Sequence, residues 1–352
     1  MPPEPDGPSG FERMDSNGNH GGEKKPFMYR VKTGLTNFMK SFRIFLYNKE
    51  HQTFFGNTSS SWIKISIYYF FFYLCLGLFF SGMIAVFAAI VSRESPTYTY
   101  RHNQMKVGGK FCIGMGFRPM PDITSTSLTV YGDSQSQNTT VSSLTSFRYN
   151  FLTQYDTTYL EECSPFNPAS KLRGSHSCKF SWDDIVTSDA HPCSTEKMYG
   201  WPIGQPCILI KLNQIYGWMP ADGNIIDAVA NATGQPILPI DQQGQNIYIT
   251  CEGREQEDKN KTGSMIYYSI LHPLGIPNYG GIPYYFFPYR NAREEVEPFV
   301  LVQFTSLPFD TKVNIICRAW APDIQQYVQG SARRGVVTFD ILRSNKSAPV
   351  TK

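Results

Sequence analysis

The chain is 352 residues long, 14% of its residues are aromatic, and its formal net charge is +3. This charge is small, and no dense run of Lys and Arg is interleaved with aromatic residues. We therefore exclude nucleic acid as a partner. A polar N-terminal tail and one long apolar segment take up the first ninety or so residues, which leaves about 260 residues for a folded unit.

The N-terminal region is expected to be cytoplasmic and to lack a globular fold. Residues 1–30 are rich in Pro, Gly, Asp, Glu and Asn, and they have too little apolar surface to offset the entropy of ordering. In the juxtamembrane segment 31–64, apolar side chains recur at steps of three and four residues from Val31 to Tyr47. This spacing predicts a short helix on the inner membrane surface.

A membrane anchor follows this region. Residues 65–91 form a run of 27 residues without a charged side chain. As a helix the run would be roughly 40 Å long, which exceeds the roughly 30 Å of the hydrocarbon core. It is too long and too far from the start for a cleaved signal peptide, so we predict a signal-anchor helix over 65–92. Trp62 and Lys64 mark one interface, and Arg93 marks the other.

Cysteines and sequons indicate the side of the membrane on which the C-terminal part lies, whereas the positive charges at both ends of the anchor do not. Seven of the eight cysteines follow the anchor, which is typical of an oxidising compartment. We therefore predict a type II single-pass glycoprotein with its N-terminus in the cytoplasm. A further sequon at Asn57 precedes the anchor and should stay unmodified. The candidate glycosylation sites after the anchor are Asn138, Asn231, Asn260 and Asn345.

The part after the anchor is predicted to be a mainly-β ectodomain. Residues 93–160 are polar and weakly periodic, so we expect an extracellular stalk with loops there. Residues 161–345 are expected to form a disulfide-stapled domain, followed by a C-terminal tail over 346–352. Apolar runs separated by Pro, Gly, Asn and Asp predict an immunoglobulin-like antiparallel β-sandwich. The predicted strands are Cys207–Trp218, Asn246–Cys251, Met265–Leu271, Phe299–Thr305, Lys312–Trp320 and Gly335–Leu342.

The sequence carries no catalytic or nucleotide-binding motif. A Walker A loop, His-Glu-x-x-His and Gly-x-Ser-x-Gly are all missing from it. His176 and His191 each lie near a cysteine, but cysteines in an oxidising compartment are more often paired in disulfides than free to bind zinc. Acidic pairs such as Glu294-Glu295 are interpreted as solvated loops. We therefore predict neither an enzyme nor a cofactor.

An aromatic cluster in the anchor predicts contact with another membrane helix. Tyr69, Phe72 and Tyr73 fall on one helical face, and a tyrosine inside the bilayer needs a hydrogen-bond partner that lipid does not offer. The alternative is that these are ordinary lipid-facing side chains. A strip of small residues at four-residue spacing would also allow close helix packing. It consists of Gly77, Ser81, Ala85 and Ala89.

A second aromatic cluster lies near the C-terminal part of the chain, where five of six successive residues are aromatic. Pro283 and Pro288 prevent a regular strand here, so some rings are expected to be exposed or to contact a partner. The alternative is a satellite core of the ectodomain itself. The candidate partner-binding residues of this aromatic loop are Tyr284, Tyr285, Phe286, Phe287 and Tyr289.

Six short blocks of the sequence carry a resemblance to a known family. They are Phe42-x-x-Phe45-x-Tyr47-Asn48, Phe55-Gly56-Asn57-Thr58, Tyr199-Gly200-Trp201, Gly204-Gln205-Pro206-Cys207 to Lys211-Leu212-Asn213, Gly281 to Tyr289, and Val302-Gln303-Phe304-Thr305. In order and spacing they resemble the β-subunits of P-type cation ATPases. Phe55 stands where an aliphatic residue is usual in that family, and Asn57 where Arg is usual.

The resemblance implies a non-catalytic β-subunit of a Na+/K+-transporting ATPase. Such a subunit assembles with the catalytic α-subunit, stabilises it, delivers it to the plasma membrane and modulates K+ transport. Its further partners would be membrane lipid and a small single-span regulatory subunit. Two alternatives stay open, the β-subunit of an H+/K+-ATPase and a pump-independent adhesion or junctional glycoprotein.

The resemblance also implies a pairing of the cysteines. The sequence alone leaves this pairing open, because six cysteines allow fifteen connectivities. Cys112 is left over, and Cys75 is a reduced residue of the anchor. The implied disulfides are Cys163 with Cys178, Cys193 with Cys207, and Cys251 with Cys317.

Overall fold

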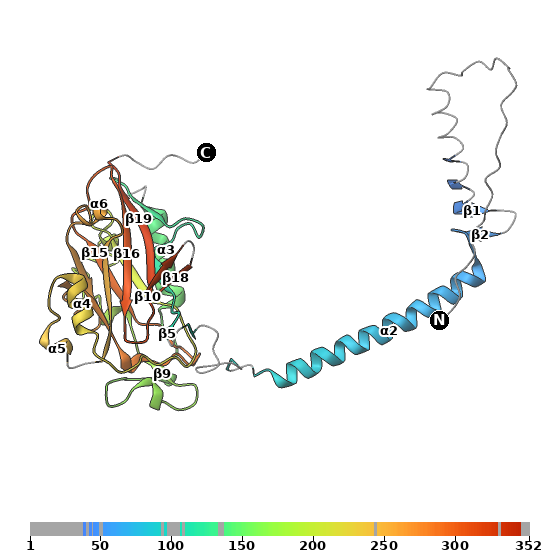
Figure 1. The fold of residues 1–352 in the computed structure, drawn as a ribbon, viewed down its shortest axis with the longest axis horizontal. Helices are drawn as coiled ribbons and strands as arrows, with labels where there is room; N and C mark the ends of the chain where they lie inside the picture. Colours follow the sequence, from blue (N-terminus) through green and yellow to red (C-terminus); the bar gives the residue numbers. More distant parts are fainter. Residues whose placement is uncertain are drawn as a thin grey trace, which may run out of the picture. The chain divides into compact units, whose positions relative to one another are not determined.

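The chain divides into two units, Met1–Ile90 and Val91–Lys352, which are described one at a time (Figure 1). The predicted tails over 1–30 and 346–352 lie outside the described residues. The computed structural model describes residues 38–39, 42–43, 45–48, 52–92, 95–96, 106–107, 110–132, 137–242, 245–329 and 332–345.

The first unit contains one long helix, α2, which spans Ser59–Ile90. Among the described residues it is the one helix that is long and apolar enough to cross a membrane. None of its side chains is buried by the described part of the chain, as expected of a helix that is solvated by lipid. It begins before the predicted segment 65–92 and ends two residues earlier, because hydropathy marks the hydrocarbon thickness and not the helix ends.

Three short antiparallel strands lead into this helix in the order β1-β2-β3. They are β1 (Tyr47–Asn48), β2 (Thr53–Phe54) and β3 (Asn57–Thr58). The juxtamembrane helix predicted to reach Tyr47 is only partly described. Its described residues at 38–39, 42–43 and 45–46 are helical, but Tyr47 already pairs with Phe54 in the small sheet.

The second unit is built from two five-stranded sheets, with strand orders β13-β12-β15-β10-β6 and β14-β11-β16-β19-β7. Neighbouring strands are antiparallel except for β19 and β7, which are parallel. One candidate membrane helix followed by an antiparallel β-sandwich is therefore confirmed. The strands of the first sheet are β13 (Ile276–Pro277), β12 (Met265–Tyr268), β15 (Phe299–Phe304), β10 (Cys207–Leu212) and β6 (Met115–Arg118). Those of the second sheet are β14 (Gly280–Pro283), β11 (Asn246–Gly253), β16 (Lys312–Trp320), β19 (Val336–Arg343) and β7 (Ser127–Val130).

Shorter elements surround the sheets. The helices are α3 (Asn138–Phe151), α4 (Ile226–Thr233), α5 (Pro239–Gln242) and α6 (Gln256–Lys259). The 3-10 turns are η2 (Thr157–Tyr159), η3 (Ala169–Lys171), η4 (Trp182–Asp184), η5 (Met198–Gly200) and η6 (Tyr284–Phe286). The remaining strand pairs are β4 (Lys106–Val107) with β5 (Lys110–Phe111), β8 (Leu160–Glu161) with β9 (Ser177–Cys178), and β17 (Tyr327–Gln329) with β18 (Ala332–Arg334).

The main core lies between the two sheets. Phe117 of β6 stacks on Phe339 of β19 with ring centroids 4.8 Å apart, and Phe304 of β15 meets the same ring edge-on at 6.3 Å. The other face of β15 is covered as well, because Phe299 packs edge-on against Phe180 at 5.2 Å. With both faces covered, all six residues of β15 are buried, and all of them except Gln303 are apolar.

The structure differs from the stalk and loops predicted over 93–160. Strands β6 and β7 and helix α3 (green in Figure 1) all belong to the ectodomain. Strand β6 pairs with β10, and Leu144 and Phe147 of α3 are buried. The signal was weak because β6 is only four residues long and α3 is mostly Ser, Thr and Asn, with a narrow apolar face.

Candidate partner interface

The anchor helix presents an aromatic face to its surroundings. Tyr69 and Tyr73 stack with their ring centroids 6.0 Å apart, and Phe72 meets Tyr73 edge-on at 5.4 Å. The structure thus brings the three predicted residues together and leaves them about half exposed. It also adds Tyr68, which stacks on Phe72 at 6.3 Å. The four-residue spacing from Tyr68 to Phe72 could have revealed this residue in the sequence.

The strip of small residues on α2 is open too. A Cβ atom added at Gly77 would meet no atom of the described chain within 4 Å. Another helix could therefore approach the backbone closely at this point.

In the ectodomain, the aromatic loop is mostly buried. Tyr284, Phe286 and Phe287 are 9%, 7% and 8% exposed, and Tyr285 and Tyr289 are half-buried. The expectation of exposed rings is therefore wrong for Tyr284, Phe286 and Phe287. The reason is the 3-10 turn η6, which directs successive side chains about 120° apart, so that each ring can reach a different neighbour.

Neighbouring elements supply these contacts. Phe286 packs edge-on against Phe180 at 5.4 Å between ring centroids, and Phe287 packs in the same way against Trp218 at 5.3 Å. The Tyr284 hydroxyl lies 3.5 Å from the Ala221 carbonyl oxygen. For these residues the structure favours the satellite core of the ectodomain.

Arg290, which sequence reasoning missed, fastens the aromatic loop to the loop that precedes β9. Its guanidinium donates from Nη1 to the Leu172 carbonyl oxygen at 2.7 Å and from Nη2 to the His176 carbonyl oxygen at 2.5 Å. Five fixed donors suit such a double contact with backbone oxygens. The position of Arg290 directly after the aromatic run was the available signal.

Glu294 and Glu295 are not a solvated pair, in contrast to the prediction. The Glu295 carboxylate accepts backbone N–H groups from Arg290 at 3.0 Å and from Ala292 at 2.8 Å, and burial raises the pKa of Glu295. The Glu294 carboxylate accepts the N–H of Tyr155 at 2.8 Å. Glu295 therefore holds the segment that follows the aromatic loop, and Glu294 ties this segment to Tyr155.

A cavity of about 200 Å³ lies next to Tyr285. Pro283 forms part of its wall, and a buried polar cluster forms another part. In this cluster the Asp241 carboxylate lies 2.8 Å from His272 Nε2 and accepts the Tyr279 hydroxyl at 2.5 Å. The half-exposed side of the loop thus borders a recess with both apolar and polar walls.

The cysteines form the three disulfides that the resemblance implies. Cys75 and Cys112 are free, and they are exposed and half-buried respectively. The paired Cα atoms are 5.4, 5.7 and 4.0 Å apart in Cys163–Cys178, Cys193–Cys207 and Cys251–Cys317.

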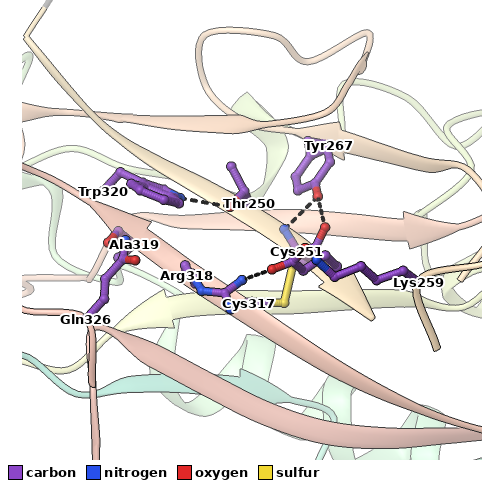
Figure 2. Close-up of polar contacts among 10 residues, drawn as sticks. Thr250, Cys251, Lys259, Tyr267, Cys317, Arg318, Ala319, Trp320 and Gln326 are labelled. Atoms are coloured by element: carbon purple, nitrogen blue, oxygen red, sulfur yellow. Dashed lines mark hydrogen bonds and ion pairs between the residues drawn. A yellow bond between two sulfur atoms is a disulfide. The ribbon is translucent and has the colours of Figure 1, made fainter. Parts of the chain in front are cut away.

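The last of these disulfides joins facing residues of β11 and β16 (Figure 2). The Cys251 N–H donates to the Tyr267 hydroxyl at 2.8 Å. Next to the disulfide, Arg318 pairs with Glu252, whose other oxygen lies 2.9 Å from Lys259 Nζ. The disulfide therefore lies within a ladder that is also held by hydrogen bonds and ion pairs.

All four candidate glycosylation sites in the ectodomain are exposed, and their glycosylation stays a prediction. The fifth sequon, before the anchor, is half-buried, and the Asn57 amide oxygen lies 3.5 Å from the Ser61 hydroxyl. The four exposed sites are Asn138, Asn231, Asn260 and Asn345.

His191, one of the two histidines considered for zinc, has a structural role. Its Nδ1 accepts the N–H of Cys193 at 3.0 Å, and its Nε2 donates to the Pro273 carbonyl oxygen at 3.2 Å. This arrangement fits the neutral ring, and burial lowers the pKa of His191. Over the described part of the chain, no group of three or more His, Cys, Asp and Glu residues could hold a metal ion.

We expect His191 to make the ectodomain sensitive to acid. Because its pKa is lowered on folding, the unfolded chain takes up a proton more readily than the folded chain. The free energy of unfolding should therefore be highest above about pH 6.5, as far as His191 determines it, and should decline as the pH falls below that value. His191→Asn keeps an acceptor for Cys193 but does not titrate. The unfolding midpoint of this variant should therefore change less between about pH 7 and pH 5 than that of the unaltered chain. An unchanged slope would assign the effect to other groups.

Comparison with known proteins places the chain in a family. The family model described as sodium/potassium ATPase beta chain matches residues 32–339. The chain is 29% identical over 316 residues to the probable sodium/potassium-transporting ATPase subunit beta-3 of Caenorhabditis briggsae, which covers 87% of this chain and 88% of that protein. It is 26% identical over 309 residues to the sodium/potassium-transporting ATPase subunit beta-1 of Drosophila melanogaster, and the match covers 86% of this chain and 93% of that protein. The identity to the human sodium/potassium-transporting ATPase subunit beta-2 is 24% over 318 residues, and the match covers 88% of this chain and 96% of that protein. Because the family model spans both the membrane helix and nearly all of the ectodomain, the chain belongs to the sodium/potassium ATPase beta chain family.

Proposed function

We propose that the chain is the non-catalytic β-subunit of a Na+/K+-transporting P-type ATPase. It assembles with the catalytic α-subunit, stabilises it, brings it to the plasma membrane and modulates K+ transport, while catalysis belongs to the α-subunit. The observation that carries this proposal is the family match over residues 32–339. The relatives described above are all named as sodium/potassium-transporting subunits, which favours this pump over an H+/K+-ATPase.

The aromatic face of α2 is the proposed contact with a membrane helix of the α-subunit. It consists of Tyr68, Tyr69, Phe72 and Tyr73, and no side chain of α2 is buried by the described chain. Tyrosine hydroxyls inside the bilayer are costly without a hydrogen-bond partner, and a neighbouring helix supplies such partners. A small single-span regulatory subunit stays a further prediction.

Tyr69→Leu combined with Tyr73→Leu is expected to lower the recovery of the α-subunit in co-purification several-fold, because about two interhelical hydrogen bonds of roughly 0.6 to 2 kcal/mol each are lost. Membrane insertion should not change, since Leu suits the bilayer. Phe71→Leu is the control, because Phe71 lies about 200° around the helix from Tyr69. Equal recovery with all variants would favour lipid-facing side chains.

In the ectodomain, Tyr285 and Tyr289 are the proposed contacts with an extracellular loop of the α-subunit. These two rings are half-buried, whereas Tyr284, Phe286 and Phe287 are buried and pack against the rest of the ectodomain. Tyrosine offers a large, rigid contact area together with a hydroxyl. The cavity next to Tyr285 could receive a side chain of the partner.

The chain is a single-pass membrane protein, and we place it in the plasma membrane with its N-terminus in the cytoplasm. Protease added to intact cells should therefore degrade the ectodomain and leave a tag at the N-terminus intact. A glycosidase for N-linked glycans should increase the mobility of the chain, because its four ectodomain sequons are exposed. An N-terminal tag that is cut from outside would reverse the proposed orientation.

A further inference from the structure

A cluster of five aromatic side chains lies at the start of the membrane-spanning helix, and of these side chains only Trp62 has an expected role, as a marker of the membrane interface. We call it the juxtamembrane aromatic cluster. Between 36% and 58% of each side chain is exposed, which is unusual for so many large rings side by side. Its members are Phe45, Tyr47, Phe54, Phe55 and Trp62.

The cluster is fixed to the start of α2. Trp62 lies in the first turns of the helix, and its indole Nε1 donates to the Phe54 carbonyl oxygen at 2.6 Å. Phe55 meets Phe54 edge-on with ring centroids 4.7 Å apart and Phe45 at 5.9 Å. These contacts join four of the five side chains to one another and to the start of α2, and Tyr47 pairs with Phe54 between β1 and β2.

The backbone of Phe55 shows that its ring is kept at some cost. Its φ of +52° lies in the left-handed region, which bulky residues rarely adopt. Such strain persists where the surrounding structure requires it, and it is often associated with function. Asn or Gly would suit this backbone better, but neither would supply a ring.

The depth of the cluster follows from its distance to the apolar segment. Strand β3 ends at Thr58 and α2 begins at Ser59, six residues before Ile65. Trp62, whose indole N–H donates to the Phe54 carbonyl oxygen, lies three residues before Ile65, which is about 4.5 Å of helix, and the polar headgroup region is about 5 to 7 Å deep on each side of the hydrocarbon core. When the apolar segment lies in the core, the cluster is therefore at the level of the headgroups.

We propose that the juxtamembrane aromatic cluster binds the headgroup and upper acyl-chain region of the leaflet at the N-terminal end of α2. Tyr and Trp prefer this region because their rings are apolar and their hydroxyl or N–H groups are polar. In the sequence from 43 to 64, three basic residues, Arg43, Lys49 and Lys64, outnumber the one acidic residue, Glu50, and this excess of positive charge suits the anionic lipids of a cytoplasmic leaflet. The cluster sets the depth and the tilt of an anchor whose apolar segment is longer than the hydrocarbon core is thick.

Photo-crosslinking in membranes that contain the full chain and its pump tests this proposal. Phe54→p-benzoylphenylalanine is expected to form adducts with phospholipid that carries a tritiated acyl chain. The matched control is the same substitution at Phe309, a residue of the ectodomain with the same exposed fraction of 54%. It should form no lipid adduct. Adducts of Phe54→p-benzoylphenylalanine with the catalytic subunit would show a protein-docking surface instead, and the absence of adducts with either would show that the cluster faces water; both outcomes overturn the proposal.

A second variant tests the ring of Phe55 without changing its left-handed backbone. Phe55→Asn should keep the backbone, because Asn tolerates the left-handed region. Loss of one half-buried ring should reduce the lipid adducts at position 54 about fivefold. Unchanged adducts would contradict a cooperative cluster. Glycosylation of the ectodomain reports correct insertion, and recovery of the catalytic subunit is measured separately, so a failure here is distinguishable from a failure of the proposed pump partner.

Discussion

Phe286→Ala is expected to destabilise the ectodomain by about 3–5 kcal/mol, the usual loss for a buried phenylalanine in a core. Phe286 is 7% exposed, and its ring contacts Phe180 and Tyr285, with centroids 5.4 and 4.6 Å away. The substitution leaves a cavity where the aromatic loop meets the sandwich. The denaturant midpoint of the purified full-length chain measures the loss, and retention inside the cell is the expected consequence.

Phe166→Ala is the matched control, because Phe166 is 89% exposed. We expect it to change stability by less than about 0.5 kcal/mol. If Phe286→Ala were as stable as this control but no longer held the pump, the loop would act as a docking surface throughout and not as part of the core.

Removal of the Cys251–Cys317 disulfide by Cys251→Ala with Cys317→Ala is expected to have the second large effect. The bridge spans 66 residues, and closing a loop of this length restricts the unfolded chain by about 4 kcal/mol in the chain-entropy model. The folded state should otherwise persist, because β11 and β16 stay paired along six residues.

The comparison is with Cys163→Ala and Cys178→Ala, which open a bridge over 15 residues worth about 3 kcal/mol in the same model. Thermal unfolding of the two double variants under identical conditions should rank them in this order. The reverse order would mean that native contacts at each site outweigh the entropy of the unfolded chain.

Most of the sandwich could be predicted from the sequence. Strand β16 has the predicted bounds, Lys312–Trp320, because an alternating apolar pattern with turn residues at both ends is a strong local signal. Strand β10 starts as predicted at Cys207 but ends at Leu212 and not at Trp218. Between these two residues Gly217 has a φ of +71°, so the chain turns where the composition still favoured a strand.

The candidate site was predicted less completely, because the fate of each ring depends on residues far away in the sequence. The sequence around Phe286 does not indicate that Phe180 is its neighbour. Likewise, the sequence around Arg290 does not indicate that Leu172 accepts its hydrogen bond. The anchor face was easier to predict, because contacts within one helix follow from spacing alone. The pairing of the cysteines required the family resemblance, since spacing left all connectivities open.

Affinity purification of the chain from detergent-solubilised membranes tests the proposed function most directly. We expect a large P-type ATPase to be recovered in equimolar amount, and its recovery to fall with Tyr69→Leu and Tyr73→Leu but not with Phe71→Leu. A chain recovered without any ATPase, or with adhesion proteins of neighbouring cells in its place, would contradict the role of a pump subunit.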